Sequence, residues 1–119
     1  MQNLPVNGIL MVTTPQALAT MVVNKTVTMA HTLKIPILGI IENMTGFFAE
    51  DTGHQYDIFG PSHSEEVARA SNALVLTHLP LRPELTKMCD DGMIESADVL
   101  EIKTVVAALE SFYKKTQPI

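Results

Sequence analysis

The segment VNGILMVTTPQ, from Val6 to Gln16, decides the fold class of this chain. Its apolar run, Ile9 to Val12, is short and continuous, which is typical of a parallel strand covered on both faces. Thr14 and Pro15 follow at once, in the order expected of a helix N-cap and a first helical residue. We therefore predict a strand that leads directly into a helix.

The helix after this strand is expected to end before Pro36. Proline has no N–H to donate inside a helix, and it disfavours helical geometry in the residue that precedes it. We predict an end near Leu33 or Lys34. Apolar residues recur at helical spacing along this segment: Leu18, Met21, Val22, Met29 and Leu33.

Two further apolar runs predict two more strands. ILGII at 37–41 and ALVLTHL at 73–79 are short, rich in branched side chains, and have a proline at one end. From Thr45 to Ser64 no period is visible, and the mixture of glycine, histidine, acids and aromatics predicts an irregular segment. Ser64 is expected to cap a short helix that carries acids in its first turn.

Two helices are predicted after the third strand. The first follows Leu81–Glu84 and ends before Asp91, and the second is an amphipathic helix from Val99 to Tyr113. This alternation predicts an α/β fold, with a mostly parallel sheet of about three strands flanked by helices. No linker or repeat is visible, so residues 1–119 are predicted to form a single domain. In so small a sheet, one edge is expected to be unpaired or supplied by another segment.

The composition limits the classes of partner. A net charge of -5 gives no broad attraction for nucleic acid or anionic lipids, so neither is expected as a partner. No apolar run approaches the ~20 residues of a membrane-spanning helix, and we recognise no targeting segment. Cys89 is the only cysteine, which excludes an internal disulfide and favours a cytoplasmic location. Because 46% of the residues are hydrophobic, some apolar surface is expected to meet another protein surface.

Three segments are candidates for a binding site, because ligands of open α/β sheets bind beyond the carboxyl ends of the strands. They are residues 13–16, 42–45 and 80–84. Asn43 offers the donor and the acceptor needed to read a purine edge, but from spacing alone a turn residue that bonds nearby backbone is the preferred interpretation. The stiff loop from Pro80 to Pro83 could face the same base, or could simply end the strand.

Other reactive side chains form no recognisable site. His54 and His63 could hold a metal together with Asp51 or Asp57, but no closely spaced pair of ligands supports this. Cys89 is interpreted as a packing residue. Four acids are interpreted as solvated turn residues rather than as an acid–base pair: Glu50, Asp51, Asp90 and Asp91. The sequence contains no glycine-rich phosphate loop, so autonomous nucleotide hydrolysis is not expected.

Four segments, in order, resemble the Mrp (ApbC) family of P-loop ATPases, relatives of MinD and ParA. They are VNGILMVTTPQ at 6–16, KIPILGIIENMTGFF at 34–48, GHQYDIFG at 53–60 and LPLRPELTKMCDDG at 79–92. The resemblance extends from Leu4 to Tyr113 and implies the C-terminal half of a three-layer P-loop NTPase-like fold. Family members are cytosolic, dimeric ATPases that bind and transfer iron-sulfur clusters.

The resemblance also implies roles for individual residues. Asn43 resembles the family asparagine that recognises adenine. Four residues resemble the loop that flanks the base: Pro80, Leu81, Arg82 and Pro83. ATP with Mg²⁺ is therefore the implied ligand, provided that the missing N-terminal half supplies the lysine loop and switch segment that precede Leu4 in the family. The implied partners are that half, a second copy in a homodimer, and iron-sulfur acceptor proteins.

Two departures from the family pattern restrict these expectations. Ala49 and Thr52 stand where the family often has a CxxC pair, so this chain alone is not expected to hold an iron-sulfur cluster. Val22 stands where the family has an aspartate. The leading hypothesis is the C-terminal portion of an ATP-binding cluster carrier, inactive alone as an ATPase. The alternatives are a degenerate protein-interaction or dimerisation module and, third, a small metal-binding protein that uses the region from His54 to His63.

Overall fold

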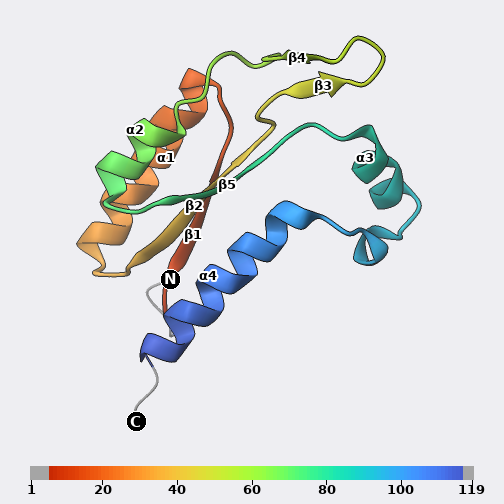
Figure 1. Cartoon of the computed structure of the whole chain (residues 1–119). Coiled ribbons are helices and arrows are strands. Elements are labelled where there is room, and N and C mark those ends of the chain that lie inside the picture. Colours follow the sequence, from red (N-terminus) through yellow and green to blue (C-terminus); the bar gives the residue numbers. More distant parts are fainter. Residues whose placement is uncertain (1–5, 117–119) are drawn as a thin grey trace.

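A parallel sheet lies between two layers of helices (Figure 1). The structure is a computed structural model that describes residues 6–116. The strands are β1 (Ile9–Thr13), β2 (Ile37–Asn43), β3 (Phe47–Ala49), β4 (His54–Tyr56) and β5 (Val75–Leu79). The helices are α1 (Ala17–Thr32), α2 (Ser64–Ser71), α3 (Pro83–Asp90), the single 3-10 turn η1 (Ile94–Ser96) and α4 (Leu100–Thr116). The predicted α/β class and its small parallel sheet are confirmed.

The parallel sheet has the order β1-β2-β5, with β2 in the centre. Val12 is the register partner of Ile41, and Asn43 is the partner of Leu79. Gly39 lets β5 approach closely, since a Cβ built there would lie 2.4 Å from the Cδ1 of Leu76. Within residues 6–116 no strand pairs with the outer edge of β1 or of β5. Both edges are open, where the sequence predicts one.

The two faces of the sheet are covered unequally. α1 and α2 pack on one face, and α4 crosses the other face against β5 (Figure 1). Six buried residues join the first face to its helices: Met11, Val23, Val27, Ile40, Val67 and Ala68. Side chains alternate along β1, so Val12 points to the second face, where it is 58% exposed. On that face Val105 of α4 is buried.

The apolar stripe that predicts α1 lies mostly on its outer side. Leu18 is 71% exposed, and Met21 and Val22 are also exposed. The buried side of the helix consists of Thr20, Val23, Val27 and Ala30. Small and β-branched side chains therefore meet the sheet, and the larger apolar ones form a surface layer. The helix ends at Thr32, close to the predicted end.

Two predicted helix caps are wrong. α1 begins after Gln16, and the hydroxyl of Thr14 donates to Oε1 of Gln16 (3.2 Å) rather than receiving a backbone N–H. Ser64 is the first residue of α2, and its hydroxyl lies 2.9 Å from Oγ of Ser62 and 3.3 Å from Nε2 of His78. In both places the side chain has a polar partner other than the helix backbone.

The segment predicted to be irregular contains a hairpin. β3 and β4 pair antiparallel, with Phe47 opposite Tyr56 and Ala49 opposite His54. The rings of His54 and Tyr56 pack edge to face, with centroids 4.6 Å apart. The prediction is wrong here because strands of three residues are too short to show a readable alternation.

The chain is less compact than a typical domain of the same length. Its radius of gyration is 16.1 Å, whereas a compact domain of this length has about 13.5 Å. The hairpin and α3 stand out from the carboxyl end of the sheet, away from the layer of α1 and α2 (Figure 1). No helix in the described range is long and apolar enough to cross a membrane.

Candidate functional site

The carboxyl ends of β2 and β5 bring the two predicted base-binding segments together. Asn43 ends β2 and is the register partner of Leu79, which ends β5. Just beyond them, the N–H of Thr45 donates to the carbonyl of Leu79 (3.0 Å). The N–H of Leu81 donates in turn to the carbonyl of Gly46 (2.7 Å). The loop after β5 therefore starts beside Asn43, although the two segments are far apart in the sequence.

Asn43 is half-buried and makes one local hydrogen bond. Its Oδ1 accepts from the N–H of Met44 (2.9 Å), which is the contact expected of a turn residue. Its amide nitrogen has no hydrogen-bond partner in the described part of the chain, and Oδ1 keeps a second lone pair. Met44 has a φ of 59°, a left-handed conformation that is uncommon outside glycine. The local bond thus leaves one donor and one acceptor of Asn43 available.

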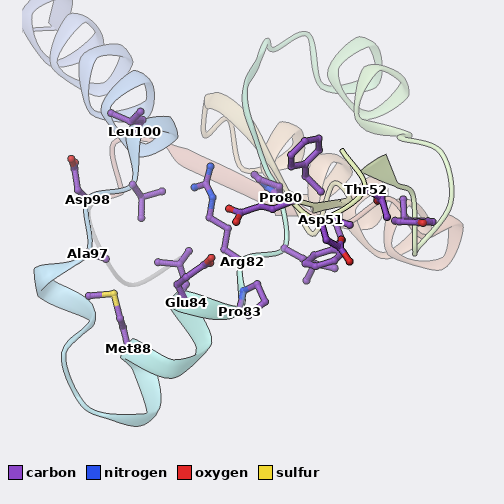
Figure 2. Close-up of a pocket in the computed structure, with 18 of the residues that line it drawn as sticks. Asp51, Thr52, Pro80, Arg82, Pro83, Glu84, Met88, Ala97, Asp98 and Leu100 are labelled. Atoms are coloured by element: carbon purple, nitrogen blue, oxygen red, sulfur yellow. The ribbon is translucent and has the colours of Figure 1, made fainter. Parts of the chain in front are cut away.

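The loop after β5 forms one wall of a groove of about 1090 Å³ (Figure 2). The other walls come from the β3–β4 hairpin, from α3, and from the segment between η1 and the first turn of α4. The four predicted loop residues all line this groove: Pro80, Leu81, Arg82 and Pro83. Asn43 is not among the lining residues, so the predicted site residues lie on two neighbouring surfaces.

Arg82, one of the groove's lining residues, is held in a bidentate ion pair. Nη1 of Arg82 donates to Oε2 of Glu101 over 2.9 Å, and Nη2 donates to Oε1. The hydrogen bond from Arg82 lowers the pKa of the Glu101 carboxyl, and the bond to Glu101 raises the pKa of the Arg82 guanidinium. This pair ties the loop after β5 to the first turn of α4. Arg82 therefore acts as a structural cation here and is not free for an anionic ligand.

A buried carboxylate lies on the opposite side of the same strand ends. Glu42 is 0% exposed and accepts hydrogen bonds from the hydroxyls of Thr45 (Oε1, 2.9 Å) and Ser62 (Oε2). The hydroxyl of Ser62 also contacts the hydroxyl of Ser64, which in turn contacts Nε2 of His78. This network anchors the loop before α2 to β2 and β5. Sequence analysis missed it, although a charge at the end of a continuously apolar strand was a visible signal.

The histidines and the cysteine gather into no metal centre. Nδ1 of His63 donates to the carbonyl of Pro15, and the ring of His54 packs on Tyr56. Residues 6–116 contain no group of three metal-ligating side chains. Cys89 is exposed on α3, so its interpretation as a packing residue is wrong.

The hairpin carries no thiolate where the family resemblance places a CxxC pair. Ala49 ends β3, and Thr52 lies in the turn, where its Oγ1 accepts weakly from the N–H of His54 (3.4 Å). Neither side chain is a ligand for iron. The acids Glu50 and Asp51 in the same turn are exposed, as predicted.

A family model described as ParA, a NUBPL iron-transfer P-loop NTPase, matches residues 1–115. Over 91 residues the chain is 37% identical to the iron-sulfur cluster carrier protein of Haemophilus influenzae, covering 76% of this chain and 25% of that protein. It is 37% identical over 94 residues to the protein of the same name from Methanocaldococcus jannaschii, covering 78% and 32%. The chain thus spans between a quarter and a third of the length of these relatives.

A solved structure shares the fold. It is a nucleotide-binding protein from Archaeoglobus fulgidus in complex with ADP, and it aligns with a TM-score of 0.68 and 34% sequence identity. The alignment covers 81% of this chain and 40% of that one. The sheet and its helices therefore correspond to part of a nucleotide-binding P-loop fold.

Proposed function

This chain belongs to the ParA family of P-loop NTPases, within its NUBPL-type iron-transfer group, and from this premise we propose that it forms the base side of an ATP site in an iron-sulfur cluster carrier. The observation that carries the proposal is the pairing of Asn43 with Leu79. This pairing puts a free amide group beside the loop that begins at Pro80. Ligands of open α/β sheets bind at this end of the strands.

Asn43 would read the adenine edge with the groups that its turn contact leaves available. The amide nitrogen donates to a ring nitrogen, and the second lone pair of Oδ1 accepts from the exocyclic amino group. The bond from Met44 holds the amide plane in place, so that little rotamer entropy is lost when the base binds. Pro80 and Pro83 restrict the neighbouring loop and keep its backbone close to the base.

The phosphates of ATP have no cradle in these 119 residues, because the sequence contains no glycine-rich lysine loop. We propose that a phosphate-loop segment completes the site and supplies the contacts to the phosphates and Mg²⁺. The relatives, which are three to four times longer than their matched regions, support this. The open edge of β1 is a suitable place for a further strand to pair. Hydrolysis then requires both parts.

An iron-sulfur cluster does not fit the described residues. Cluster iron is bound by several thiolates, and the chain has one cysteine, Cys89 on α3. In our proposal the cluster is cargo held by ligands outside this chain, and the carrier serves iron-sulfur acceptor proteins. A cytoplasmic location and a homodimeric carrier remain part of the proposal.

Calorimetry tests the base site. We expect the 119-residue chain alone to bind ATP weakly, and the same chain joined to a phosphate-loop segment from a relative to bind it well. Asn43→Ala in the joined protein should weaken ATP binding by about tenfold, which corresponds to ~1.4 kcal/mol for a lost base contact. Asn24→Ala, at an exposed position of α1, is the control. Equal affinities for Asn43→Ala and the unchanged protein would exclude base recognition by Asn43.

A protein-interaction or dimerisation module is the second candidate. It is favoured by the exposed apolar layer of α1, where Leu18, Met21 and Val22 lie together on the outer side. Native mass measurement of the chain alone separates the candidates. A stable dimer that is dispersed by Val22→Glu and binds no ATP after completion supports the module, whereas ATP binding after completion supports the carrier.

A further inference from the structure

The groove beside the loop after β5 is acidic. Four carboxylates line it: Glu50, Asp51, Glu84 and Asp98. Its one cation, Arg82, is engaged by Glu101, and Asp98 is neutralised by Lys103 at 3.3 Å. Glu50 and Asp51, in the turn of the hairpin, form no ion pair with any residue in the described range. The turn therefore presents two uncompensated negative charges at the rim of the groove, one of them on Asp51 (Figure 2).

The same groove has an apolar lining. Phe48 of the hairpin and Leu100 of α4 are exposed at its sides, and Tyr56 lines it from the opposite face of the hairpin, which it shares with Phe47. Leu85 and Met88 of α3 are half-buried among its lining residues. Exposed aromatic and aliphatic side chains that share one groove are typical of a protein-binding surface, and methionine adapts to different partners.

The shape of the groove favours a polypeptide over a single base. It is bounded by four separate elements, so an occupant would contact all of them along its length. A purine would fill only the part near Pro80.

We infer that this groove docks a cationic, apolar protein segment. Leucine or aromatic side chains of the segment pack on Phe48 and Leu100, and its lysine or arginine side chains reach Glu50 and Asp51. Charge complementarity identifies this occupant, because the uncompensated charges at the rim attract cationic side chains and repel acidic segments. The proposal does not rest on ATP binding, since Asn43 is outside the groove.

A labelled synthetic peptide of leucine and lysine tests the charge requirement by fluorescence anisotropy. The 119-residue chain should bind it, and the double variant Glu50→Lys, Asp51→Lys should bind at least about tenfold more weakly. The matched control is Glu65→Lys, Glu66→Lys, which reverses two exposed acids on α2, outside the groove. Equal weakening by both double variants would show only non-specific attraction and would overturn the proposal.

Two further measurements test the groove itself. A peptide with glutamate in place of lysine should bind the unchanged chain at least about tenfold more weakly, and equal binding of both peptides would contradict the assigned charge. Phe48→Ala should weaken binding of the lysine peptide severalfold, while Leu74→Ala, at a site 76% exposed and outside the groove, should not. Thermal unfolding of each variant checks that the fold is retained.

The experiment separates this inference from the proposed function. Asn43→Ala should leave peptide binding unchanged while it weakens ATP binding to the completed protein. The double variant Glu50→Lys, Asp51→Lys should weaken peptide binding and leave ATP binding to the completed protein unchanged. Loss of peptide binding in Asn43→Ala alone would place the peptide at the base site and overturn the inference, without affecting the test of ATP binding.

Discussion

The two faces of the parallel sheet differ in how completely they are covered. On the face of α1 and α2, Ile40 and Val67 are fully buried, and even the carboxylate of Glu42 is enclosed with hydrogen-bond partners. On the other face, α4 covers β5 and leaves Val12 of β1 58% exposed. The same three strands thus form a buried core under α1 and α2, on the closed face, and a partly covered surface under α4, on the open face. Stability is expected to come mainly from the first face, and further binding from the second.

The largest loss of stability should come from shortening a buried side chain on the closed face. Ile40→Ala removes buried methyl groups from the central strand and should lower the free energy of unfolding by ~2–5 kcal/mol. Val12→Ala, on the open face of the neighbouring strand, should cost less than ~1 kcal/mol, since its side chain is largely solvated already. Urea unfolding measures both, and Ile40→Val provides a milder variant if Ile40→Ala does not fold.

The same pair of variants sharpens the comparison when a phosphate-loop segment is joined to the chain. If that segment covers the β1 side of the open face, the cost of Val12→Ala should rise toward that of a buried valine, and the cost of Ile40→Ala should not change. A Val12→Ala cost that is already large in the chain alone would show that the open face is covered in solution by something else, such as a second copy.

A smaller effect is expected for the buried carboxylate. Glu42→Ala leaves the hydroxyls of Thr45 and Ser62 without their acceptor and should cost ~1–3 kcal/mol. Glu42→Gln keeps one carbonyl acceptor and should cost less. Glu66→Ala, at an exposed position of α2, is the control and should be close to neutral. Equal costs for Glu42→Ala and Glu66→Ala would mean that the network contributes nothing to the closed face.

The ion pair that ties α4 to the open face should contribute less again. A double-mutant cycle with Arg82→Met and Glu101→Gln should give a coupling of ~0.5–1 kcal/mol, because both side chains are partly exposed and solvent screens the pair. The pKa of Glu101 is lowered in the folded state, so its contribution is present above the pKa of the unfolded chain. It is lost as the pH falls through the lower folded value.

Unfolding followed from neutral to acidic pH checks this sign. The stability difference between the unchanged chain and Glu101→Gln should be greatest near neutral pH and should shrink in acid. A difference that grows as the pH falls would contradict the assigned direction. Lys87 of α3 and Asp91 just after it form an exposed pair 3.9 Å apart and offer a control in which the coupling energy should be close to zero.

The features predicted correctly from sequence are those that depend on short local patterns. The parallel strands are apolar runs with a proline close to one end, and the terminal helix has a clear helical period, so neighbouring residues suffice to identify them. The buried side of α1 could not be identified from a local pattern. Thr20 and Ala30 face the sheet because close packing favours small side chains there, whereas hydropathy gives more weight to larger apolar residues.

The features that were missed depend on contacts between distant segments. Thr14 and Ser64 look like caps until other side chains take their hydroxyls. The enclosure of Glu42 requires Ser62 to fold back onto the end of β2, and no local period records that contact. The groove likewise needs the hairpin, α3 and α4 to converge. Asn43 and the Pro80 loop could be named as candidates from the sequence, but their pairing comes from the parallel register of β2 and β5.

The smallest effect is expected on the outer side of the closed layer, and it tests whether that layer ends the molecule. Val22 of α1 is 59% exposed, so Val22→Gln should change the free energy of unfolding of a monomer by no more than ~0.5 kcal/mol. The measurement is urea unfolding at two protein concentrations. A larger loss that grows with concentration would mean that Val22 is buried between two copies. The outer side of α1 would then be a dimer interface, because its apolar layer would be covered by the same layer of a second copy.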